Sequence, residues 1–100
     1  MTLISPTLTD RQRELAASAV LYLSKRHDAA ALIDGFECTH DELTVLSRLI
    51  GADLTLSVDQ RELASTAVEY LRHSLSDRDL ADAYDCTPAD LDEIFNLLQL

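Results

Sequence analysis

Carboxylate side chains crowd the stretch from residue 77 to residue 93. It holds seven Asp and Glu residues against a single Arg, a net charge of -6 over 17 positions. The seven are Asp77, Asp79, Asp82, Asp85, Asp90, Asp92 and Glu93. Carboxylates held along a rigid scaffold can pair with Arg and Lys side chains through charge-assisted hydrogen bonds, as DNA phosphates do. We therefore expect these residues to bind the basic surface of a nucleic-acid-binding protein.

Residues suited to other chemistry are sparse. Cys38 and Cys86 are too few for a disulfide framework or a zinc site, and the three histidines fall at no metal-ligand spacing. The chain contains no Ser/His/Asp or Cys/His arrangement of known type and no glycine-rich phosphate loop. We expect a protein that is not an enzyme, binds no metal or cofactor, and takes no small-molecule substrate.

The charge of the whole chain excludes another class of partner. The formal net charge is -10 over 100 residues, with -8 in residues 53–100 and only -2 in residues 1–52. A charge of this size repels nucleic acid and attracts basic surfaces, so we expect no direct DNA binding. The alternative interpretation is a solvated acidic face that only keeps the chain soluble.

The sequence also indicates where the chain resides. Its first residues, "MTLISPTLTDRQ", lack the basic start and the long apolar run of a signal peptide. No apolar run approaches the length of a membrane span. We expect a cytoplasmic protein that does not bind membranes.

The chain aligns with itself, without a gap, when it is shifted by 48 residues. "QRELAASAVLYL" at residues 12–23 matches "QRELASTAVEYL" at 60–71, and "LIDGFECTHDEL" at 32–43 matches "LADAYDCTPADL" at 80–91. Over residues 9–50 against 57–98, 15 of 42 positions are identical. This self-similarity predicts an internal duplication.

Composition and capping signals predict an all-α fold. Ala and Leu are abundant, whereas Gly and Pro occur only twice each. The expected helix starts are capping boxes at Thr9/Gln12, Ser57/Gln60 and Thr39/Glu42, single caps at Asp28 and Ser76, and Thr87 followed by Pro88. The expected helices span about residues 10–26, 29–36 and 40–50, and about 58–74, 77–84 and 88–98.

These helices predict a single domain over residues 1–100. Repeat one is residues 9–50, a linker follows at 51–56, and repeat two is residues 57–98. A three-helix unit of about 45 residues has a thin core of its own. We therefore expect the two repeats to pack together as one compact globule.

In both repeats the second and third helices resemble a helix-turn-helix. Cys38 and Cys86 fill the turn, but Glu37 and Asp85 replace the glycine that is usual there. The helix that would enter the DNA major groove, at residues 88–98, carries three acids and no Lys or Arg. Since DNA affinity depends on basic residues that neutralise phosphates, we expect a scaffold whose partner is not DNA.

Two further functions stay open. One is a degenerate helix-turn-helix transcriptional regulator. Its basic residues would be Arg11, Arg13, Lys25, Arg26 and His27. The other is an antitoxin-like or adaptor-like module that binds a basic protein.

By its length, acidity, helical content and lack of catalytic motifs, the whole chain resembles small phage-encoded anti-CRISPR proteins that act on the type I-F guide-RNA surveillance complex. This resemblance implies a stoichiometric inhibitor that binds the Cas subunits of the complex in the bacterial cytoplasm. It also implies that target DNA is blocked, because such a complex holds the guide–target duplex in a basic channel. An acidic ligand in that channel would compete with DNA directly.

Overall fold

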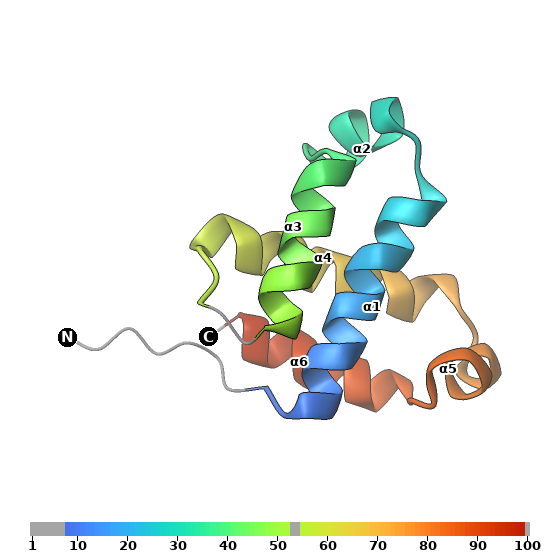
Figure 1. The fold of residues 1–100 in the computed structure, drawn as a ribbon. Coiled ribbons are helices and arrows are strands. Elements are labelled where there is room, and N and C mark those ends of the chain that lie inside the picture. Colours follow the sequence, from blue (N-terminus) through green and yellow to red (C-terminus); the bar gives the residue numbers. More distant parts are fainter. Residues whose placement is uncertain (1–7, 53–54, 100) are drawn as a thin grey trace.

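In the computed structural model, residues 8–52 and 55–99 are described, and all their regular elements are α-helices (Figure 1). The helices are α1 (Asp10–Arg26), α2 (Ala29–Phe36), α3 (His40–Gly51), α4 (Val58–Ser74), α5 (Asp77–Tyr84) and α6 (Pro88–Leu98). The all-α prediction is confirmed, and α3 ends one residue later than expected. The expected linker at residues 51–56 includes residues 53 and 54, which lie outside the described part of the chain.

The helix starts follow the sequence signals closely. Reciprocal capping boxes open α1 at Thr9 and α4 at Ser57. At α3 the expected box is only half formed, because the Glu42 carboxylate lies 3.4 Å from the Thr39 hydroxyl and not on its backbone N–H. The full box forms instead at α6, where Asp90 accepts a hydrogen bond from the backbone N–H of Thr87 at 2.9 Å.

α1 and α4 form the centre of the molecule. They pack against each other, α3 packs on α1, and α6 packs on α4, so each repeat contributes one central and one outer long helix (Figure 1). Apolar residues at helical spacing line the contact between the central helices. The fully buried members are Ala16, Ala19, Val20 and Leu23 of α1 and Ala64, Ala67, Val68 and Leu71 of α4.

Aromatic rings tie the short helices to the opposite repeat. Tyr22 of α1 meets Tyr84 of α5 edge to face at 6.5 Å between ring centroids, and Tyr70 of α4 meets Phe36 of α2 in the same way at 5.9 Å. Tyr22 and Tyr70 also contact each other at 6.0 Å. Positions related by the shift of 48 therefore make matching contacts across the two halves, the pattern that a twofold relation produces. The expectation that the repeats pack together is confirmed, while the internal duplication itself stays a prediction.

Both helix-turn-helix-like turns contain a residue in the left-handed backbone region. Glu37 ends α2 and Asp85 ends α5, each with φ of 53°. Glycine adopts this conformation without a steric penalty, whereas a side chain makes it less favourable. In both turns the backbone N–H of this residue returns to carbonyl oxygens of the preceding helix, and Cys38 or Cys86 is buried directly after it.

Candidate protein-binding surfaces

The seven carboxylates expected to bind a partner lie on α5, on the residue that ends it, and on α6. Six of them are exposed, and Asp90 is half-buried. Four already have partners inside the molecule. These pairs are Asp82 with Arg78 at 3.9 Å, Asp85 with Arg11 at 3.8 Å, Asp92 with Arg72 at 2.6 Å, and Asp90 with the backbone of Thr87.

The other three carboxylates, Asp77, Asp79 and Glu93, make no ion pair with any residue in the described part of the chain. A carboxylate without an internal cation can pair with a partner's Arg or Lys without first breaking an existing bond. Within the predicted set, these three are therefore the residues most available to a partner.

The structure does not bring the α6 acids to one face. Asp90 and Glu93 line a small hollow beside the first turn of α1, with Arg11 and Gln12. Asp92 lies on another side, in a hollow lined by Arg72 and His73 of α4. A single flat partner surface therefore cannot contact all three.

Asp90 also has a structural role, because its carboxylate completes the capping box that starts α6. Loss of such a cap costs about 0.5–2 kcal/mol of stability. A charge reversal at Asp90 therefore tests folding as well as binding.

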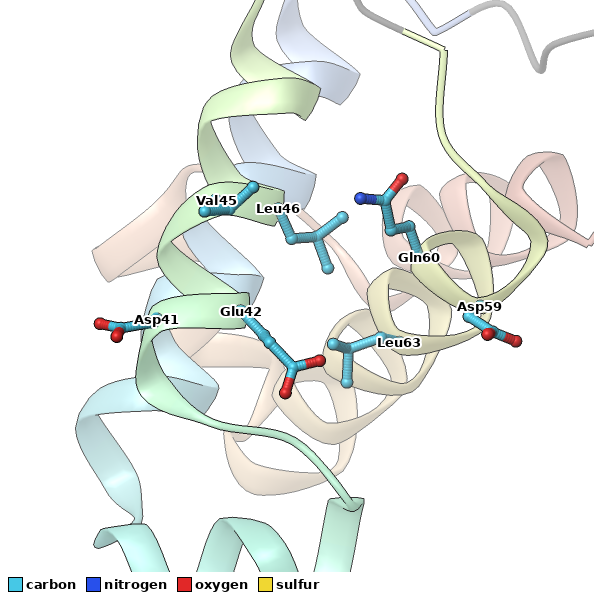
Figure 2. A pocket seen from close by; sticks show the side chains of 7 residues that line it. All are labelled: Asp41, Glu42, Val45, Leu46, Asp59, Gln60 and Leu63. Atoms are coloured by element: carbon cyan, nitrogen blue, oxygen red, sulfur yellow. The ribbon is translucent and has the colours of Figure 1, made fainter.

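A second acidic surface, not anticipated from the sequence, lies between α3 and the start of α4 (Figure 2). Leu46 of α3 and Leu63 of α4 point toward each other across a hollow of about 290 Å³. Glu42 and Gln60 also point into this gap, whereas Asp41 and Asp59 point outward at its edges. The hollow therefore has an apolar floor and carboxylates at its rim.

This hollow adjoins a larger one of about 520 Å³ at the end of α2, and the two share Glu42, Asp59 and Leu63. We call the pair the repeat-one groove. Its lining includes six carboxylates and no Lys or Arg. The six are Asp34, Glu37, Asp41, Glu42, Asp59 and Glu62.

At the end of α5, the place equivalent to the larger hollow is occupied by Arg11, whereas the equivalent of the smaller hollow persists as one of about 190 Å³ lined by Arg11, Leu15 and Glu93 among others. The Arg11 guanidinium donates hydrogen bonds to the backbone carbonyls of Tyr84, at 3.3 Å, and Asp85, at the end of α5. The shift of 48 matches Asp59 to Arg11, and it matches Phe36 and Glu37 to Tyr84 and Asp85. Since a carboxylate cannot donate these bonds, no side chain within the described residues closes the end of α2.

Charges counted repeat by repeat along the sequence do not reveal this groove. Asp59 and Glu62 belong to repeat two along the chain, yet they line a hollow whose other walls come from α2 and α3 of repeat one. The usable signal was the change of sign between Arg11 and Asp59 within an otherwise matching segment.

The buried cysteines are poorly suited to nucleophilic chemistry. Burial, and next the charge of Glu42, raises the pKa of the Cys38 thiol. Burial also raises the pKa of Cys86, with further increases from Asp90 and Asp85 against a lowering by Arg11. Because the thiolate is the reactive form, these shifts disfavour reaction at neutral pH.

The basic residues of the alternative DNA-binding interpretation are partly engaged within the protein. Arg11 binds the end of α5, Arg13 contacts the Leu8 carbonyl and Asp10, and Arg26 lies over the Tyr22 ring at 5.7 Å. They belong to α1, whose inner face is buried against α4. They therefore form no basic surface on the helix-turn-helix-like units themselves.

Two further features are absent from residues 8–52 and 55–99. No three His, Cys, Asp or Glu side chains there come together in a way that could hold a metal ion. No helix there has both the length and the apolar character needed to cross a membrane.

No protein-family model, no curated protein and no solved structure matches the chain.

Proposed function

We propose that this chain is a non-enzymatic inhibitor that binds a basic, nucleic-acid-binding protein surface and excludes DNA from it. The observation that carries the proposal is the acidity of the α5–α6 unit, where a helix-turn-helix-like scaffold presents carboxylates in place of Lys and Arg. Such a surface repels phosphates and attracts the residues that bind them.

The first partner to test is the type I-F guide-RNA surveillance complex, because the chain resembles inhibitors of that complex in size and acidity. Its Cas subunits hold the guide–target duplex in a basic channel. In the proposed mechanism, Asp77, Asp79 and Glu93 pair with Arg or Lys side chains that otherwise contact DNA.

A competition assay tests this function. The purified complex is incubated with the protein before labelled target DNA is added, and bound DNA is measured by fluorescence anisotropy. We expect DNA binding to be lost near a stoichiometric amount of the protein. Full DNA binding at a large molar excess, together with no co-purification, would remove this complex as the partner.

Two matched triple variants locate the contact. The triple D77N, D79N and E93Q neutralises the unpaired α5–α6 acids, and the triple D34N, D41N and E62Q removes the same charge from the repeat-one groove. Each charge-assisted hydrogen bond contributes about 1.5–3 kcal/mol. We therefore expect the first triple to weaken inhibition by about tenfold or more, and the second to change it by less than about threefold.

A further inference from the structure

We infer that the repeat-one groove binds an arginine-bearing apolar segment of another protein. This surface is separate from the α5–α6 acids of the proposed function and shares none of the seven predicted residues. The inference therefore stands or falls independently of that function.

The contact of Arg11 with the end of α5 shows how a ligand's arginine can bind at the end of α2. The Arg11 guanidinium of α1 reaches the end of α5 and donates to two adjacent backbone carbonyls beside the Asp85 carboxylate. In repeat one, the matching carbonyls belong to Phe36 and Glu37, and Glu37 supplies the matching carboxylate. A guanidinium from a partner can take the same position, since its planar fork suits two neighbouring acceptors.

The charges around this position favour a cation strongly. Asp59 stands at the position equivalent to Arg11, so the place that holds a guanidinium at the end of α5 is bordered at the end of α2 by an additional carboxylate. Glu42, also in the lining, contributes a further negative charge. A phosphate or a nucleic acid is excluded by the same charges.

The apolar floor of the groove favours a ligand with apolar side chains next to its arginine. Leu63 is half-buried, whereas its equivalent Leu15 is only 6% exposed. Val45 is 49% exposed on the α3 wall, whereas its equivalent is the charged Glu93. The repeat-one groove thus leaves apolar side chains uncovered next to the place where a guanidinium can bind. An amphipathic segment that carries Arg beside Leu-like residues matches both features.

The test uses three fluorescein-labelled amphipathic peptides at physiological salt, where weak long-range attraction is screened. The first has Arg and Leu on one helix face, the second replaces Arg by Lys, and the third replaces Leu by Ala. We expect the Arg/Leu peptide to bind most tightly and to shift the amide NMR signals of Val45, Leu46 and Leu63. No binding, equal binding of all three, or shifts confined to α5 and α6 would overturn the inference.

The variant D59R introduces at this position the arginine that its equivalent, Arg11, provides at the end of α5. It should fill the groove from within and weaken the Arg/Leu peptide by about tenfold or more. The matched control E69R makes the same charge change on α4, outside both hollows of the groove, and should weaken binding by less than about threefold. Equal effects of the two variants would show attraction by net charge alone and would contradict the inference.

The variant V45E copies the residue of repeat two and separates the two contributions without depending on D59R folding. An added acid should strengthen a purely electrostatic complex, whereas a lost apolar contact should weaken a complex seated on the groove floor. We expect weakening, and strengthening would overturn the inference. If the amide NMR signals of Val45, Leu46 and Leu63 shift as the protein concentration rises without any peptide, the groove binds a second copy of this chain. That result would also overturn the inference.

Discussion

The equivalent helices α2 and α5 end in the same backbone conformation but in different surroundings. At the end of α5, Arg11 closes the carbonyls of the turn and pairs with Asp85. At the end of α2, Asp59 stands in the same place and the groove stays open. The exchange of Arg11 for Asp59, together with that of Glu93 for Val45, distinguishes a helix end bonded within the protein from one left open to a partner.

The largest expected effect tests whether the two repeats share one core. Leu32 and Leu80 are equivalent and both fully buried. L32A and L80A should each lower the free energy of unfolding by about 2–5 kcal/mol, since a buried leucine leaves a cavity when truncated. Urea denaturation followed by circular dichroism measures this loss. A second transition in either variant would show that the halves unfold separately.

The helix caps give the next comparison. Thr87 belongs to a full capping box, whereas Thr39 belongs to a half-formed one. T87A should cost about 1 kcal/mol or somewhat more, and T39A should cost less, because removing a cap costs about 0.5–2 kcal/mol. Thermal melts of the two variants compare these costs directly. Equal losses would mean that the reciprocal bond from Asp90 adds nothing.

Removal of Arg11 sharpens the difference between the two helix ends. R11A deletes the hydrogen bonds to Tyr84 and Asp85, but the Arg11 side chain is 51% exposed and water replaces part of the interaction. We expect a loss of about 1 kcal/mol or less in urea denaturation. The control is D59A at the end of α2. Because Asp59 donates no hydrogen bond to that helix end, this variant should lower the free energy of unfolding by less than R11A does.

Glycine at the two turns should stabilise the protein unequally. E37G and D85G each relieve a left-handed conformation that costs a side chain about 1–2 kcal/mol, and the greater entropy that glycine loses on folding offsets about 0.5–1 kcal/mol of this gain. D85G also removes the pair with Arg11, so its gain should be smaller than that of E37G. The comparison uses thermal melts of both variants, and a larger gain from D85G would contradict it.

The smallest expected effect is a pH dependence set by the buried thiols. Burial holds the pKa values of Cys38 and Cys86 above those of the unfolded chain, so unfolded thiols lose their protons first. The unfolded state then binds fewer protons, and stability should fall as the pH rises above about 8.5. Urea titrations at pH 7 and 9.5 measure the fall, which should be smaller in a C38A/C86A double variant. An equal fall in that variant would assign it to other groups.

Much of the fold was predictable because its signals are local. The hydroxyl caps, the Pro after Thr87 and the 3.6-residue spacing of leucines determine helix starts and buried faces without reference to the rest of the chain. The capping box expected at Thr39 and Glu42 is only half formed, because the partner that the Glu42 side chain takes depends on its surroundings. Local pattern therefore accounts for the elements and for most of their ends.

The candidate surfaces were less predictable because they join residues distant in the chain. Nothing near Asp85 in sequence indicates that Arg11, 74 positions away, binds its carbonyl. Likewise, the internal pairing of Asp92 with Arg72 depends on how α6 packs on α4. Which carboxylates remain available to a partner is therefore a property of packing, and composition alone overstates their number.

The reciprocal contacts of Tyr22 with Tyr84 and of Phe36 with Tyr70 are those of two subunits around an axis, yet one chain makes both. In a symmetric dimer of identical subunits, every substitution occurs twice, so the two grooves would have to remain alike. Covalent continuity removes that constraint. One half can keep its arginine for internal stability while the other exchanges it for aspartate, so that specialisation of one groove need not destabilise the other.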